Sequence, residues 1–254
     1  MKSKILLSIL FVIAFSGAIR AQTDSTVSTT SSNKKFTSGF AVYAEFGVLS
    51  NSSITDIRKS LRAQGIQPFG SLMSSLVFAK RTESDRWVID HRIILMNSTK
   101  YDDKVDIKRA SLWGIGLGIS AGRKIVNTTK WNVYIPVGLD AMLYQMGIKS
   151  NHSASLAKLV ANPGSYQAVR LYTGSLNVNA GVGVDYKTNF MPKLYDKFYV
   201  STKVSYHLPV TSGSQWKGEN VQVNDLANLK PSQLYASIGI VMVPRPGRKW
   251  RGMH

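Results

Sequence analysis

The sequence predicts an all-β fold, an eight-stranded antiparallel up-and-down transmembrane β-barrel with short helical turns in long outer loops. Three observations predict it. Apolar and polar residues alternate with period two over eight segments, as in strands that have two different faces. The connections between these segments alternate between long and short, and one face of each segment is almost wholly apolar. An even strand number, alternating faces and unequal loops are together typical of transmembrane barrels.

The first residues are typical of a secretory signal peptide. Lys2 and Lys4 precede an apolar run of about 15 residues, and the small residue Ala21 follows it. The next stretch is rich in serine and threonine and has no periodicity, which favours a flexible leader. The expected organisation is a signal peptide over 1–21, a flexible periplasmic leader over 22–37, a barrel over 38–243 and a basic C-terminal tail over 244–254.

The strands are expected wherever the period-two alternation continues for about ten residues. In the second segment, "SLMSSLVFAK", polar residues occur on both faces, so its phase stays open. The expected strands lie near 39–49, 70–81, 86–97, 107–124, 131–147, 168–187, 197–210 and 232–243.

The fourth segment shows most clearly how the two faces differ. Trp113, Ile115 and Leu117 alternate with glycines. An eight-stranded barrel has an interior just wide enough for side chains, so the face with glycines and charges is expected inside. The apolar face would form a very large exposed patch in water, so we expect it to contact lipid. Aromatic residues next to the short turns are expected to form an interfacial girdle, namely Trp87, Trp131, Tyr186 and Phe198.

Charged residues occur on the face that is expected to point inward. Buried charges need partners, so we expect an internal hydrogen-bonded network of four acids and two bases. The residues of this lumen network are Glu45, Asp90, Arg92, Asp140, Asp185 and Lys203. His91 is expected to point outward and to be isolated.

Two of the long connections have helical periodicity. Ile54, Ile57 and Leu61 share a helical face, and Gly65 is placed to end that helix. A second set with similar spacing is formed by Leu156, Leu159 and Val160. We expect two short helices that pack over the barrel mouth, and a folded binding surface is the alternative.

The composition predicts neither disulfides nor a bound cofactor. Cysteine is absent, so a secreted chain of this size is held together without disulfides. The four histidines show no metal-ligand spacing. The glycines of "GIGLG" alternate within an expected strand rather than opening a helix, so no phosphate-binding loop is expected. We expect no metal and no cofactor.

With these features the chain resembles the small outer-membrane β-barrels of the OmpA/OmpX-like and "porin family" type. The resemblance covers about residues 38–243 and rests on architecture and patterning. It implies an outer-membrane location, with the N-terminus and short turns in the periplasm and the long loops outside. Members of this group usually end on an aromatic residue that closes the last strand, whereas "PRPGRKWRGMH" follows Val243 here.

The chain is strongly basic, with a formal net charge of +18. Outside the cytoplasm such a surface favours lipid phosphates or acidic polysaccharide, so no nucleic-acid partner is expected. A solvated basic surface without a specific ligand is the alternative. The lipid-phosphate contacts expected at the outer rim are Arg58, Lys59, Arg62, Lys108 and Arg109. The basic residues expected at the periplasmic rim include Lys80, Arg81, Arg123, Lys124 and Lys197.

One set of residues has the types that nucleophilic catalysis needs. Ser205 and His207 are both expected to point inward on the seventh strand, and Glu219 follows in the next loop. These types match a nucleophile, a base and an orienting acid. Because two residues at this spacing arise easily by chance, a hydrogen-bonded lumen histidine is the preferred interpretation.

The expected function is that of an integral outer-membrane barrel without wide-pore activity, because eight strands leave no wide channel. We expect a structural, adhesive or envelope-assembly role through the outer loops. The expected partners are outer-membrane lipid, including lipopolysaccharide, and an envelope protein or polysaccharide. A lipid-modifying enzyme that uses Ser205 and His207, and a soluble barrel that carries an apolar ligand, stay open as alternatives.

Overall fold

The computed structural model describes most of the chain from Phe36 to Arg245. The described residues are 36–49, 51–98, 108–150, 169–190, 192, 194–211, 215–218, 222–223, 226–231 and 233–245. The expected signal peptide, most of the leader and the tail beyond Arg245 lie outside the described residues, as does the helix expected around Leu156, Leu159 and Val160.

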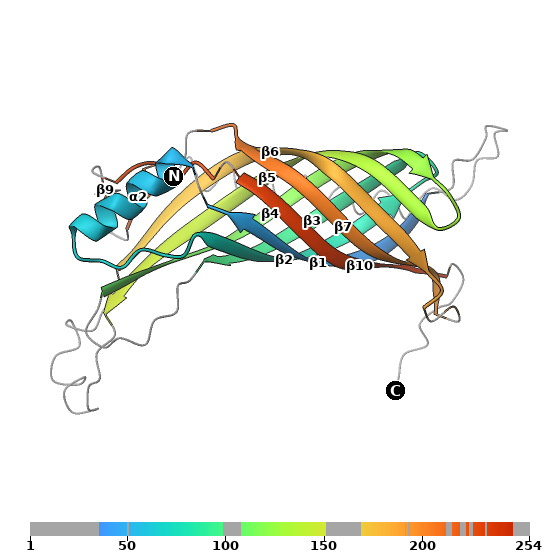
Figure 1. Cartoon of the computed structure of the whole chain (residues 1–254), viewed down its shortest axis with the longest axis horizontal. Coiled ribbons are helices and arrows are strands. Elements are labelled where there is room, and N and C mark those ends of the chain that lie inside the picture. Colours follow the sequence, from blue (N-terminus) through green and yellow to red (C-terminus); the bar gives the residue numbers. More distant parts are fainter. Residues whose placement is uncertain are drawn as a thin grey trace, which may run out of the picture. The chain divides into compact units, whose positions relative to one another are not determined.

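Eight long strands of the described chain wrap into a closed antiparallel barrel (Figure 1). Each strand pairs with its neighbours in sequence order, and the pairing of the first strand with the last closes the wall. The predicted eight-stranded up-and-down barrel is therefore confirmed, and each expected strand overlaps an observed one. The strands are β1 Thr37–Val48, β2 Leu72–Glu83, β3 Trp87–Ser98, β4 Lys108–Asn127, β5 Trp131–Ser150, β6 Val169–Thr188, β7 Tyr195–Pro209 and β10 Gln233–Pro244.

The pairing register gives the barrel a pronounced strand tilt. When register partners are followed from Glu45 across β2, β3, β4 and β5, the residue reached on β6 is Thr173. When they are followed from Glu45 in the other direction, across β10 and β7, the residue reached on β6 is Gly183. These two positions on β6 are ten residues apart, and this offset is the shear of the barrel.

Burial alternates along every strand and places the apolar face outside. Ile93, Val137 and Ile238 point outward and are 49%, 53% and 55% exposed, whereas their glycine and charged neighbours are turned toward the lumen. On β2, whose phase the sequence leaves open, the inward residues include Val77, Ala79 and Arg81. Since a one-residue change of phase moves every side chain to the other face, Arg81 lies in the lumen rather than at the rim as expected.

The glycines of the inner face make room for large lumen side chains. A Cβ atom at Gly118 would overlap the carboxylate of Asp140, and one at Gly183 would overlap the ring of Tyr134. The glycine-rich inner face of β4 therefore packs against side chains from its neighbour rather than lining open space.

The end of the barrel that carries the long connections is capped by a helix, α2 Ser52–Ala63 (Figure 1). Asn51 begins the helix by accepting a hydrogen bond from the backbone N–H of Ile54 at 2.9 Å. The helix ends at Gln64, and Gly65 follows with a φ of 67°. The buried face is the predicted one, formed by Ile54, Ile57 and Leu61. No helix of the described residues is long and apolar enough to cross a membrane.

Two further segments hold α2 against the barrel, and we call this capped end the mouth. Gln67 bonds to β4 through Lys108 and Ala110, with two backbone hydrogen bonds of 2.8 Å. Residues 226–231 also contact α2, because the Ser53 hydroxyl donates a hydrogen bond to the Asn228 carbonyl. The two-residue strands β8 Trp216–Lys217 and β9 Gln222–Val223 continue the sheet beside β6.

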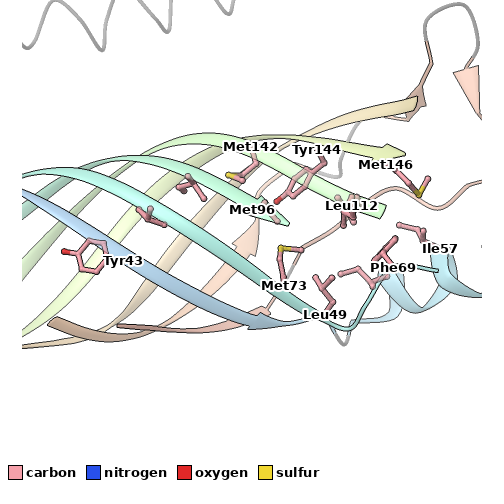
Figure 2. Packing of buried hydrophobic residues seen from close by; sticks show 14 of the residues in the cluster. Tyr43, Leu49, Ile57, Phe69, Met73, Met96, Leu112, Met142, Tyr144 and Met146 are labelled. Carbon is pink, nitrogen blue, oxygen red and sulfur yellow. The ribbon is translucent and has the colours of Figure 1, made fainter. Parts of the chain in front are cut away.

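A hydrophobic cluster runs from the mouth into the barrel (Figure 2). Figure 2 shows Met73, Met96 and Met142 inside the barrel wall, and Phe69 and Ile57 beside the helix. Trp216 is fully buried in the same cluster, and its indole N–H donates to the Ala227 carbonyl at 3.0 Å. The cap is therefore held by apolar packing that is continuous with the lumen.

Candidate functional site in the lumen and at the mouth

The six charged residues expected in the lumen all lie there, and each is at most 5% exposed. They come from five different strands, so the fold brings together residues that are far apart in sequence. They are Glu45 on β1, Asp90 and Arg92 on β3, Asp140 on β5, Asp185 on β6 and Lys203 on β7.

Arg81 is at the centre of the first cluster. Its Nε and Nη2 bond to the two carboxylate oxygens of Asp90 at 2.8 and 3.0 Å, and its Nη1 bonds to Asp185 at 2.8 Å. Its Nη2 also lies 2.6 Å from the hydroxyl of Tyr43 and 3.1 Å from that of Tyr134. Arg81 is completely buried, so this arrangement supplies the partners that a buried guanidinium needs.

Asp140 is at the centre of the second cluster. Its Oδ1 lies 2.6 Å from Nη2 of Arg92, and its Oδ2 accepts a hydrogen bond from the Asn179 amide at 2.6 Å. Nδ1 of His207 lies 3.5 Å from the same Oδ2. The other ring nitrogen of His207, Nε2, lies 3.2 Å from the hydroxyl oxygen of Ser205.

Lys203 links Glu45 to the first cluster. Its ammonium lies 3.6 Å from Oε1 of Glu45 and 5.3 Å from the centre of the Tyr43 ring, while Tyr43 bonds to Arg81. Glu45 and Lys203 therefore extend the Arg81 cluster toward the Asp140 cluster, and Glu45 and Asp140 line the same small cavity. Ser, Asn and Tyr residues of the inner face complete this network.

The end of the barrel with the short turns is closed by a third ionic group. Glu83 lies 3.4 Å from the Lys124 ammonium and 2.8 Å from that of Lys197, and it accepts a bond from the Tyr199 hydroxyl at 3.1 Å. Lys124 and Lys197 lie at the short-turn end, as the sequence predicts. Their ammonium groups, however, are paired with the Glu83 carboxylate inside the barrel end and are not directed to lipid.

A small cavity remains between the Asp140 cluster and the cap. Its volume is about 20 Å³, and its lining includes Glu45, Asp140, His207, Tyr235 and Pro231. A space of this size holds about one water molecule. The lumen is thus filled by its own side chains at this level.

Ser205, His207 and Asp140 have the order of a nucleophile, a base and an orienting acid. Glu219, expected in the acid's place, lies outside the described residues, and Asp140 takes that place from another strand. Ser205 is 3% exposed and does not line the cavity next to His207. This arrangement fits a lumen histidine held by its hydrogen bonds better than a site that admits a lipid.

The five basic residues expected to contact lipid phosphates lie at the mouth. Lys59 and Arg62 are exposed on α2, and Arg58 is half-buried beside them. Burial, together with the neighbouring Arg62 guanidinium, lowers the pKa of Arg58. Lys108 and Arg109 begin β4, which the bridge between Gln67 and Arg109 places next to the α2 connection.

The sequence did not single out several residues of these clusters. Tyr43, Tyr134 and Asn179 bond directly to the ionic groups. Their inward phase was visible in the period-two pattern, and large polar side chains on an inward face are the signal that would have identified them.

Three solved structures are similar to this chain. A major outer membrane protein from Thermus thermophilus is 13% identical with a TM-score of 0.43, and 81% of this chain and 98% of that chain are covered. Ail, the attachment invasion locus protein of Yersinia pestis, is 11% identical with a TM-score of 0.38, covering 82% and 96%. Neisserial surface protein A is 10% identical with a TM-score of 0.37, covering 82% and 96%. No family model and no curated protein matches the sequence.

Proposed function

We propose that this chain is an integral outer-membrane barrel without wide-pore activity, which uses its mouth as a structural, adhesive or envelope-assembly surface. The observation that carries the proposal is an apolar outer wall around a lumen that is filled by ion pairs. In this proposal the signal peptide directs the chain across the inner membrane, and the capped mouth faces outward.

The outer wall supports a lipid environment. Large apolar residues point outward from all eight strands, and many of them are about half exposed, including Phe40, Ile119 and Leu139. A water-soluble protein avoids an apolar surface of this extent. A closed barrel leaves no unpaired strand edge, which is the condition for strands in hydrocarbon. The soluble ligand-carrying alternative needs an apolar lumen, whereas the centre of this lumen is ionic.

The filled lumen supports the absence of a wide pore. Arg81 and Arg92 extend from the wall to carboxylates on other strands, and Glu83 closes the short-turn end. General diffusion of solutes through such an interior would require several buried ion pairs to separate, which is costly.

The mouth supports an interaction role. It presents basic side chains on α2 and at the start of β4, which fit the phosphates of outer-leaflet lipid, including lipopolysaccharide. An acidic polysaccharide or an envelope protein with an acidic surface would fit the same groups. The five contacts proposed for these phosphates are Arg58, Lys59, Arg62, Lys108 and Arg109.

Two measurements test this function. Membranes of cells that express the chain are washed with alkaline carbonate, and the purified chain is added to planar bilayers. We expect the chain to stay in the membrane pellet and to produce no large unitary conductance. Release by carbonate would support the soluble barrel, and a stable conductance of porin size would contradict the closed lumen.

The enzymatic alternative is supported by the Ser205–His207–Asp140 geometry and has its own test. Lipid A is compared by mass spectrometry between cells that express the native chain and cells that express Ser205→Ala. We expect identical lipid A. A modification that only the native chain produces would establish the enzyme.

A further inference from the structure

Lys80 and His91 lie side by side on the outward face of the barrel. Their Cα atoms are register partners across β2 and β3, and both residues are exposed. The sequence predicted an isolated His91 and placed Lys80 at the rim. The structure instead brings two nitrogen-bearing side chains together within an otherwise apolar surface.

The surroundings of this pair are hydrophobic. Phe40 is the register partner of Lys80 on β1, and Ile119 is the partner of His91 on β4. Lys80 lies three residues before Glu83, the last residue of β2, which is about 10 Å along the strand. The pair therefore lies within the apolar belt but on the side of the short turns. A cation at a lipid-facing position is destabilising unless it reaches an anion or water.

A third basic side chain lies toward the same end of the barrel. Arg123 is exposed on β4, and its register partner on β3 is Trp87, which is 45% exposed. We call Lys80, His91 and Arg123 the β2–β4 patch. Long basic side chains extend along apolar surface toward headgroups, so Lys80 and Arg123 are directed to the same interfacial zone.

A second copy of this chain does not fit the patch. A symmetric pair that buried this patch would bring two basic surfaces together, because both copies present the same surface. Apart from Asp196 at the start of β7, the outward positions of the described strands carry no acidic residue. In the strand order, β7 lies on the opposite side of the barrel from β3. The outward positions of the described strands therefore provide no complementary anion beside the patch.

We propose that the β2–β4 patch binds the phosphate of an anionic phospholipid in the leaflet at the short-turn end. This inference rests on the proposed membrane location. Lys80 supplies a compact ammonium, His91 a second donor, and Arg123 a planar guanidinium that suits phosphate oxygens. The acyl chains lie over neighbouring outward residues such as Phe78 and Ile93.

The test places a photoreactive amino acid at Ile89, which lies on β3 between Trp87 and His91. The full chain is inserted into vesicles of equal parts phosphatidylglycerol and phosphatidylcholine, irradiated and analysed by mass spectrometry. We expect phosphatidylglycerol adducts to exceed phosphatidylcholine adducts by about fivefold, the factor that one basic group near the surface provides. In Lys80→Gln/His91→Gln/Arg123→Gln we expect a ratio near one, and Lys217→Gln on the distant β8, an exposed lysine outside the patch, serves as the matched control.

The outcomes separate this inference from the proposed function. Equal adduct ratios in the native chain and the triple variant, with both inserted, would overturn the lipid site and leave the barrel proposal intact. Failure of the native chain to insert would instead contradict the proposed function. Adducts of Ile89 to another protein in native membranes would show a protein partner at this surface and would overturn the lipid assignment. As an independent check, Lys80→Leu should unfold at higher denaturant than the native chain in pure phosphatidylcholine and show a smaller phosphatidylglycerol preference.

Discussion

Arg81 on β2 and Asp90 on β3 are register partners across the inner wall of the barrel, and two hydrogen bonds of 2.8 and 3.0 Å join them. The same guanidinium reaches Asp185 on β6. One side chain therefore ties neighbouring strands together and also crosses the lumen to a distant part of the wall.

Replacing Arg81 should strongly destabilise the barrel. In Arg81→Met, the carboxylates of Asp90 and Asp185 lose their buried cation, which we expect to cost about 3–5 kcal/mol of unfolding free energy. The measurement is denaturant unfolding of the refolded chain in vesicles. Lys130→Met, at an exposed lysine in the short turn between β4 and β5, is the matched control. Equal stability of the two variants would show that Arg81 does not organise the lumen.

Adding side-chain volume at Gly118 should destabilise the barrel, whereas adding volume on the outer face of the same strand should not. A Cβ at Gly118 overlaps the Asp140 carboxylate, so Gly118→Val displaces the group that holds Arg92, Asn179 and His207. We expect a loss of about 1–3 kcal/mol. Ala121→Val, on the outward face of the same strand, should leave stability nearly unchanged. The comparison is made by denaturant unfolding of both variants.

The cap, formed by α2 and residues 226–231, should unfold locally while the barrel stays folded. Trp216 is fully buried between the cap segments, and Trp216→Ala removes its packing and its bond to Ala227. Loss of a buried tryptophan costs about 3–5 kcal/mol where the site cannot collapse. We expect faster hydrogen exchange over residues 52–63 and 226–231, with unchanged exchange in β1 and β10. Faster exchange throughout the barrel would mean that the cap and the wall unfold together.

The sequence predicts the wall of this protein better than its interior. The eight strands follow from a pattern with period two, which is a local property of the chain. The phase of β2 does not follow from this pattern, because polar residues lie on both of its faces, namely Ser74, Ser75, Lys80 and Arg81. The phase is decided by pairing, which sets Arg81 against Asp90 inside and Lys80 against His91 outside.

The candidate site depends on contacts that no local pattern contains. Asp140 and His207 lie on β5 and β7 and meet only because β6 between them brings their inner faces together. Residues 226–231 have no periodicity, and they are held at the mouth by bonds to Ser53 and Trp216. The alternation predicted six of the charges that point inward but not Arg81, and the identity of their partners required the closed barrel.

The outward face provides the most direct test of the lipid environment. Val137 is 53% exposed and lies on β5, six residues after the aromatic Trp131. An arginine at the midplane of a barrel's lipid face costs about 2–4 kcal/mol, whereas near the interface the cost is about 0–1 kcal/mol. Val137→Arg should therefore destabilise the refolded chain in vesicles by the larger amount. Val126→Arg, at an exposed valine near the end of β4, should have little effect. In water both substitutions would replace an exposed apolar side chain with a charged one, and neither would be costly. A large difference between the two variants thus requires that the middle of the wall lies in hydrocarbon, and equal unfolding free energies would contradict the proposed location.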